Sequence, residues 1–198
     1  MFDNKLCVVL SLRPLDNLLI TISGPAGSGK SHCASKLAEL YGIPCHSVGS
    51  IFRKMASERG LSVEEFSRLA ERDPTIDQEL DRRTSEIASK GGQIIEGRLV
   101  SFFSKSFPNT LRFYLTAPFE ERVKRIAMRE GISVDVAEVR TRMREESERQ
   151  RYRSLYNIDI NDLSVYDFVI NTSKWDKESV VLLLKDIIDL YLKTSSKE

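Results

Sequence analysis

A glycine-rich segment near the N-terminus constrains the fold of this chain more than any other feature. It reads Gly24-Pro25-Ala26-Gly27-Ser28-Gly29-Lys30-Ser31 and matches G-x-x-x-x-G-K-[ST] at every fixed position. An apolar, β-rich run over 18–23 precedes it, and a helical pattern over 31–41 follows it. Glycines let successive backbone N–H groups point at phosphate oxygens, and the helix N-terminus adds positive charge. The sequence therefore predicts a phosphate-binding loop (P-loop) between a buried strand and a helix.

The loop indicates an ATP-binding site with a bound Mg²⁺. Lys30 is a mobile cation placed to reach the β- and γ-phosphates, and the Ser31 hydroxyl is a ligand for Mg²⁺. We count the loop residues from Gly24 to Ser31 as ATP-binding, together with His32, an ordinary helix residue in sequence terms that lies beside the loop. The guanine-reading tetrapeptide N-K-x-D does not occur in the sequence, which disfavours a GTPase.

Strand-like and helix-like segments alternate along the rest of the chain. Strands are predicted at 18–23, 44–48, 93–96, 111–115 and 168–171. Helices are predicted at 31–41, 51–59, from Ser62 onward, 74–88, 118–130, 134–156 and 176–192. This alternation predicts an α/β fold: a three-layer sandwich of the P-loop NTPase type, with a five-stranded parallel sheet, helices on both faces, and small acceptor-binding and lid segments.

We expect a single domain over 18–193, with an acceptor-binding insert at about 50–90, a lid at about 130–157 and a polar tail at 194–198. Residues 1–17 form an N-terminal extension of uncertain status. The apolar run 6–12 within it is too short to span a bilayer and resembles a signal peptide poorly, so it is either a short edge strand or part of no domain.

Composition excludes several classes of function. The 198 residues carry a formal net charge of +1, which gives no electrostatic reason to expect a nucleic-acid or membrane partner. Three cysteines without a C-x-x-C pair, and only two histidines, argue against a disulfide framework and a zinc site. We expect a cytoplasmic protein, as a monomer, with small-molecule partners.

Arginines recur just after predicted strands, where open α/β sheets bind their ligands. Arg53 follows the strand at 44–48, and Arg98 follows the strand at 93–96. Both are candidates for a bidentate grip on a second phosphate group. Glu96 ends its strand facing the loop, so it is a candidate to hold a water molecule of the Mg²⁺ shell.

The segment 134–156 is a long, highly charged helix that contains six arginines and no lysine. At about 100° per residue, Arg140, Arg144, Glu148 and Arg151 fall within about 80° of one another. A solvated helix would tolerate lysine, whereas arginine suits planar recognition of phosphate, and Glu148 can orient the guanidiniums.

Two phosphate sites suggest phosphoryl transfer between two phosphorylated ligands. A phosphate monoester is largely dianionic at neutral pH because its second pKa is near ~6, so its oxygen needs no general base. Catalysis then reduces to alignment and charge neutralisation, with the arginine-rich helix as a lid that excludes water.

In their order and content, several segments resemble the archaeal-type cytidylate kinases of the nucleoside monophosphate kinase superfamily. These are the P-loop and the segments 49–53, 77–83, 96–98, 144–152 and 166–173. The resemblance runs from about Leu18 to Leu192 and leaves residues 1–17 unmatched. It implies transfer of the γ-phosphoryl group of ATP to CMP or dCMP, with Mg²⁺ as cofactor.

The resemblance also implies roles for individual residues. Ser50, Arg53 and Arg98 would bind the acceptor phosphate, and Lys30, Arg144 and Arg151 would be catalytic, the two arginines as lid residues on the transferred group. Arg125 and Arg129 would flank the adenine, and Asp77, Asp81 and Arg82 would cover the acceptor nucleoside. Glu96 stands where related kinases have an Asp, which keeps the charge but lengthens the reach.

Two other functions remain open on sequence grounds. One is a kinase of another nucleoside monophosphate or small acceptor, and the other is a non-catalytic ATP-binding switch. An acceptor that stimulates ADP formation would separate the kinases from the switch.

Overall fold

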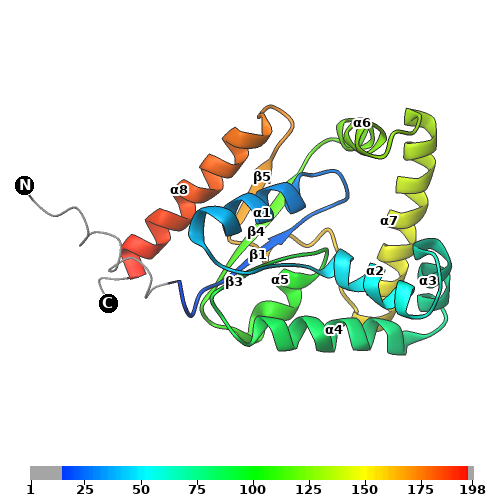
Figure 1. Cartoon of the computed structure of the whole chain (residues 1–198), viewed down its shortest axis with the longest axis horizontal. Helices are drawn as coiled ribbons and strands as arrows, with labels where there is room; N and C mark the ends of the chain where they lie inside the picture. Colours follow the sequence, from blue (N-terminus) through cyan, green and yellow to red (C-terminus); the bar gives the residue numbers. More distant parts are fainter. Residues whose placement is uncertain (1–14, 196–198) are drawn as a thin grey trace, which may run out of the picture.

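The computed structural model of the chain describes residues 15–195, and its centre is a parallel sheet of five strands in the order β2-β3-β1-β4-β5 (Figure 1). The strands are β1 (Leu19–Ser23), β2 (Cys45–Ser47), β3 (Gln93–Glu96), β4 (Thr110–Thr116) and β5 (Phe168–Asn171). All five strands predicted from sequence are present, with ends within two residues of the predicted ones, so the predicted α/β fold is confirmed. The apolar run 6–12 lies outside the described residues.

Helices surround the sheet and extend beyond its carboxyl edge (Figure 1). They are α1 (Lys30–Tyr41), α2 (Val48–Glu58), α3 (Val63–Ala70), α4 (Pro74–Ala88), α5 (Val100–Phe103), the short 3₁₀ helix η1 (Ser104–Ser106), α6 (Phe119–Glu130), α7 (Val134–Tyr156) and α8 (Lys177–Ser195). The elements α5 and η1 were not predicted. Among residues 15–195, no helix is both long enough and apolar enough to cross a bilayer.

Alternating residues of the sheet supply the two main cores. Ile20, Ile22 and Phe113 pack with α1 and α8, for example against Leu37 and Leu184. On the other face, the buried side chains of Leu19 and Ile95 pack with Ala88 of α4 and Val100 of α5. Because strand side chains point alternately to the two faces, the inner strands β1 and β3 are buried on both sides. The P-loop follows the carboxyl end of β1, the central strand.

Two smaller cores organise the segments around the site. Helices α2, α3 and α4 share a cluster that includes Met55, Phe66 and Ile76. Helices α6 and α7 share another, with Ile126 and Ala137, and Ala26 of the P-loop packs against it. Helices α2 to α4, which lie in the predicted acceptor-binding insert, therefore share one apolar centre, and helices α6 and α7 share another.

Candidate active site

The P-loop joins β1 to α1, and its shape depends on glycine. Gly24, Gly27 and Gly29 have φ values of 139°, 79° and 98°, a region that favours glycine. A Cβ on Gly24 would lie 2.0 Å from the carbonyl oxygen of Leu115, and one on Gly27 would lie 2.6 Å from that of Arg122. The loop therefore packs directly on β4 and α6, with no room for side chains at these two positions.

Four successive carbonyl groups of the loop accept hydrogen bonds from side chains. Those of residues 25–28 accept, in order, from Lys30 Nζ at 2.9 Å, Arg122 Nη1 at 2.9 Å, Arg125 Nη1 at 3.4 Å and Thr172 Oγ1 at 3.2 Å. These bonds hold the carbonyl groups in place, and the Ser28 N–H also donates to Pro25 O at 3.3 Å. A glycine-rich loop that ends at the N-terminus of α1 suits an anion.

Lys30 lies at the centre of the loop in a partly buried environment. Burial lowers the pKa of its ammonium to about 8, with Glu96 opposing the shift and the charges of Arg98 and Arg144 adding to it. The two arginines, predicted at a second phosphate site, are thus close enough to repel Lys30. This concentration of positive charge is suited to phosphate groups.

Ser31 and Glu96 form a pair of oxygen donors beside Lys30. The Ser31 hydroxyl donates to Glu96 Oε1 at 3.1 Å, and the Glu96 side chain is buried at the end of β3. A hydroxyl and a carboxylate are ligand types that Mg²⁺ accepts directly or through water. The donor set therefore fits the divalent ion that a P-loop implies.

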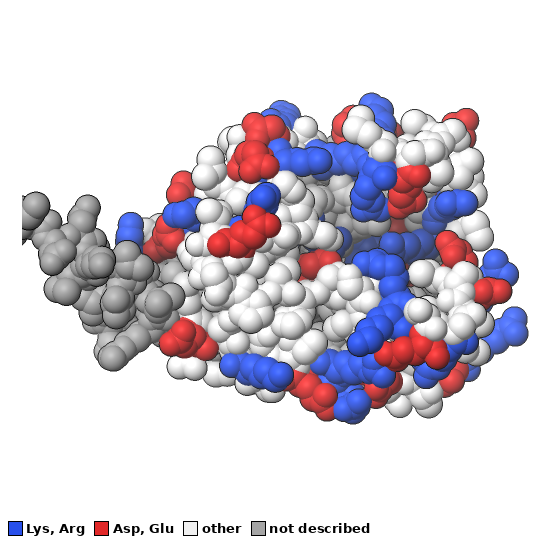
Figure 2. All heavy atoms as spheres, viewed as in Figure 1, with Lys and Arg blue, Asp and Glu red and all other residues white. Residues whose placement is uncertain are grey.

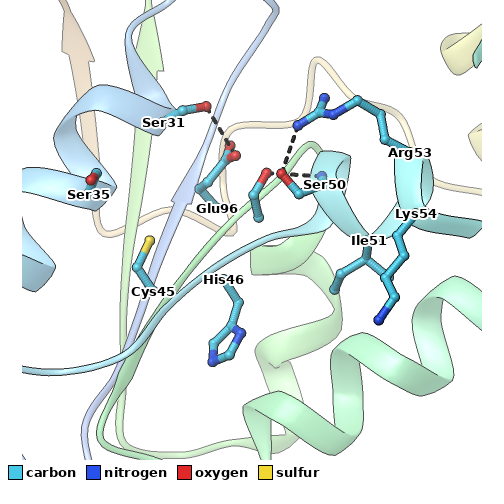
Figure 3. Close-up of a pocket in the computed structure, with 10 residues that line it drawn as sticks. Ser31, Ser35, Cys45, His46, Ser50, Ile51, Arg53, Lys54 and Glu96 are labelled. Carbon is cyan, nitrogen blue, oxygen red and sulfur yellow. Dashed lines mark hydrogen bonds between the residues drawn. The ribbon is translucent and has the colours of Figure 1, made fainter.

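A cavity of about 460 Å³ opens beside this pair, between α1, β2 and α2. Figure 3 shows Ser31 and Glu96 on one side and Ser50 with Arg53 on another. Arg53 Nη2 donates to Ser50 Oγ at 2.7 Å, which holds the exposed guanidinium near the cavity. The predicted acceptor residues of α2 thus lie next to the pair of Ser31 and Glu96.

Arg98 and Arg144 share one carboxylate. Arg98 Nε donates to Glu148 Oε2 at 2.7 Å, and Arg144 Nε donates to Glu148 Oε1 at 2.8 Å. Burial alone would raise the pKa of Glu148, but the two guanidiniums hold it at about 2. The Arg98 side chain is 13% exposed and that of Arg144 is 59% exposed, so Arg144 keeps a face open to solvent.

Arg151 lies apart from Arg144, beside Asp77 of α4. Its Nη1 is 3.5 Å from Asp77 Oδ2, and its guanidinium lies near the rings of Phe52 and Tyr152. Both side chains are more than nine-tenths buried, and Asp77 Oδ2, Arg151 Nε and Arg151 Nη1 have no hydrogen-bond partner. Burial raises the pKa of Asp77, and Arg151 opposes that shift. Unpartnered buried polar atoms are costly, so this pair is suited to a ligand that supplies the missing bonds.

The remaining predicted residues have other contacts. Arg82 pairs with Glu79 and Glu86 on its own helix. Arg129 pairs with its neighbour Glu130 and is exposed. Asp81 accepts a hydrogen bond from Tyr156 of α7, and burial raises its pKa to about 6. His32 lies 3.2 Å from Glu178 of α8, and Arg140 is exposed on α7.

Sequence reasoning missed three residues that hold the site together: Arg122, Glu145 and Thr172. Arg125, predicted beside the adenine, donates to Thr172 as well as to the loop carbonyl of Gly27. The spacing 122, 125 and 129 places three arginines on one face of α6, which is the signal that could have identified Arg122.

Lys and Arg side chains gather around a hollow between the sheet and α7, in the view of Figure 2. Lys30 comes from the P-loop, Arg98 from the turn after β3 and Arg144 from α7. Three separate elements thus contribute cations to one place, which can bind several phosphate groups at once.

Comparison with known proteins identifies related sequences along most of the chain. The sequence profile of the cytidylate kinase-like family matches residues 19–174. The cytidylate kinase of Pyrococcus horikoshii is 49% identical over 176 residues, spanning 89% of this chain and 91% of that protein. The cytidylate kinase of Methanopyrus kandleri is 45% identical over 181 residues, spanning 87% of this chain and 94% of that protein.

Solved structures share the fold at lower sequence identity. An uncharacterized protein from Eubacterium ventriosum has a TM-score of 0.64 at 21% identity, over 87% of this chain and 98% of that one. Shikimate kinase from Acinetobacter baumannii has a TM-score of 0.59 at 18% identity, over 92% of this chain and 98% of that one. At these identities the likeness shows the fold alone.

Proposed function

This chain belongs to the cytidylate kinase-like family, and we propose that it transfers the γ-phosphoryl group of ATP to CMP or dCMP. The observation that carries the proposal is the convergence of Lys30, Arg98 and Arg144 at the P-loop. Two phosphorylated substrates repel each other, and a cluster of cations from three elements offsets that repulsion.

Each substrate would have its own set of cations. The loop N–H groups and Lys30 would bind the ATP phosphates, with Lys30 moving from Pro25 O to the β- and γ-phosphates. Arg53 and Arg98 would bind the phosphate of the acceptor, because Arg53 borders the cavity and Arg98 follows the end of β3, two residues after the cavity residue Glu96. Arg144, with its open face, would neutralise the group in transfer.

Ser31 and Glu96 would hold Mg²⁺, Ser31 directly and Glu96 through a water molecule. The ion would supply positive charge that offsets the charge of the β- and γ-phosphates. The protein's own part is to fix these two oxygen donors beside Lys30. The acceptor phosphate is already ionised at neutral pH, so no protein side chain is needed as a base.

Arg151 and Asp77 would read the base of the acceptor. A carboxylate can accept from the exocyclic amino group of cytosine, and a guanidinium can donate to the ring nitrogen and carbonyl. Their unpartnered atoms support this assignment. The aromatic ring of Phe52 lies next to Arg151 and supplies an apolar wall.

An acceptor panel tests the function. Release of ADP from ATP is followed with CMP, dCMP, UMP, AMP or GMP as acceptor, and without acceptor. We expect CMP or dCMP to stimulate ADP release most strongly. If another acceptor is preferred, the protein is a kinase of that molecule, and if no acceptor has an effect, the switch is favoured.

A further inference from the structure

Arg122 of α6 contacts three separate parts of the site. Its Nε donates to Ala117 O at 3.1 Å, and its Nη1 donates to Ala26 O of the P-loop at 2.9 Å. The same Nη1 donates to Glu145 Oε1 at 2.7 Å, and Nη2 lies 3.4 Å from Glu145 Oε2. Because a guanidinium is planar with donors in fixed directions, these acceptors set its orientation.

Glu145 of α7 carries the connection on to the acceptor side. Its Oε1 also lies 3.3 Å from Nη2 of Arg98. One lid carboxylate therefore joins Arg122, which holds the P-loop, to Arg98 at the end of β3. The loop, the lid and the acceptor side meet at this carboxylate.

The three side chains of this connection are largely buried. Their exposed fractions are 8% for Arg122, 16% for Glu145 and 13% for Arg98. Away from solvent, charge pairs are weakly screened, and removing one partner leaves the other uncompensated. Arg122 also packs tightly against the P-loop at Gly27. A Cβ built on Gly27 would lie only 2.9 Å from the Cβ of Arg122, so the two segments have little room to shift against each other.

We propose that Arg122 and Glu145 form a positioning bridge, which holds the lid and Arg98 in register with the P-loop during phosphoryl transfer. The proposal rests on the kinase function proposed above. Neither side chain needs to touch the transferred group. A misplacement of about 1 Å can cost about 100-fold in rate, so loss of the bridge lowers kcat more than it weakens substrate binding.

The variant Glu145→Gln tests the bridge because it keeps the size of the side chain and removes its charge. The matched control is Glu138→Gln on the same helix, whose carboxylate pairs with exposed Arg142 at 2.8 Å. For each variant, kcat for CMP-dependent ADP formation, Kd for ATP by calorimetry, and Tm are measured. We expect E145Q to have a lower Tm than E138Q, because it leaves buried arginines uncompensated. At a temperature well below its Tm, E145Q should still lose at least tenfold in kcat, with Kd for ATP within threefold of wild type. Wild-type kcat in E145Q would overturn the bridge, as would a loss explained by Tm alone.

A double-variant cycle tests whether Arg122 and Glu145 act together. Arg122→Lys keeps the charge but lacks the planar fork of separate nitrogens that reach Ala117 O, Ala26 O and Glu145. If the two residues act as one unit, R122K/E145Q is no slower than the slower single variant. Losses that multiply would overturn the bridge. If R122K does not fold, the result for E145Q decides alone. An E145Q protein that is fully folded at the assay temperature and keeps its Kd for ATP has not lost activity through unfolding.

Failure of the bridge and failure of the proposed function have different signatures. A wild-type protein without CMP-dependent ADP formation overturns both. An active wild type with an equally active E145Q overturns the bridge alone.

Discussion

Arg98, in the turn after β3, donates from Nε to Oε2 of Glu148 on α7, with the two atoms 2.7 Å apart. The other oxygen of Glu148 accepts from Arg144, so one carboxylate binds both an arginine that follows β3 and an arginine of α7. Both guanidiniums retain further donors that can bind phosphate. The pairing explains how the arginines stay together before a substrate neutralises them.

Replacement of Arg98 by Ala should raise the KM for CMP by about 10- to 100-fold, the range expected when a charged hydrogen bond of roughly 1.5–3 kcal/mol is lost. The KM for ATP should change much less, because Lys30 and the loop N–H groups remain. Steady-state kinetics with each substrate varied in turn measures both. Arg142→Ala on the exposed face of α7 is the control, and an unchanged KM for CMP in R98A would remove Arg98 from the acceptor site.

The rate at limiting ATP should fall as pH rises above about 8. Burial lowers the pKa of Lys30 to about 8, so the substrate-free enzyme loses this cation at higher pH. The parameter kcat/KM for ATP reports the free enzyme and should decline, while kcat should decline at higher pH because bound phosphate restores the charged form. Nucleotide phosphates finish ionising near pH ~7, so they add no change above pH 8. A flat kcat/KM between pH 7.5 and 9.5 would contradict this environment for Lys30.

Asp77→Asn should weaken discrimination between CMP and UMP. The Asn amide can donate to the uracil carbonyl that replaces the cytosine amino group, whereas Asp77 can only accept when ionised. We expect the ratio of kcat/KM for CMP over UMP to fall by about 10-fold or more. Tm is measured alongside, because Asp77 faces buried Arg151. Glu86→Gln on the exposed face of α4 is the control, and an unchanged ratio in a folded D77N protein would place base recognition elsewhere.

Asp81 should make the protein less stable as pH rises from about 4 to 6. Burial raises its pKa to about 6 in the folded state, above the 3.8 of the unfolded chain, so the folded state holds the proton more tightly in this interval. Asp81→Asn removes that proton binding. Its free energy of unfolding relative to wild type should increase between pH 4 and 7 by roughly 1–2 kcal/mol, allowing for partial exposure.

Urea denaturation of both proteins at pH 4 and pH 7 measures this difference. Asp186→Asn is the control, because Asp186 is exposed on α8. If the difference in free energy of unfolding between D81N and wild type does not vary with pH, Asp81 titrates in the same range in the folded and the unfolded protein.

Local patterns predicted most of the fold. The strands follow from apolar runs and the P-loop from contiguous residues, since both signals lie within one segment. The elements α5 and η1 are too short, at 4 and 3 residues, for a helical period to be visible. The pairing of Arg144 with Glu148 was expected from their i,i+4 spacing, which the structure confirms.

Contacts between distant segments could not be predicted. Arg122 and Ala26 lie 96 positions apart, and Arg122 looks in sequence like any charged residue of an amphipathic helix. The helical wheel also grouped Arg151 with Arg144, but seven residues advance about 10 Å along a helix axis. That rise places Arg151 beside Asp77 of α4, away from Arg144.

The most direct test of the account follows the phosphorus atom itself. The protein is incubated with ATP labelled with ³²P at the γ position, CMP and Mg²⁺, and the products are separated by chromatography, with Lys30→Ala as the inactive control. The account predicts label in CDP in equal amount to the ADP formed, and loss of that label by several orders of magnitude in K30A. Label that appears only as inorganic phosphate, or that remains in ATP, would contradict phosphoryl transfer to the nucleotide acceptor.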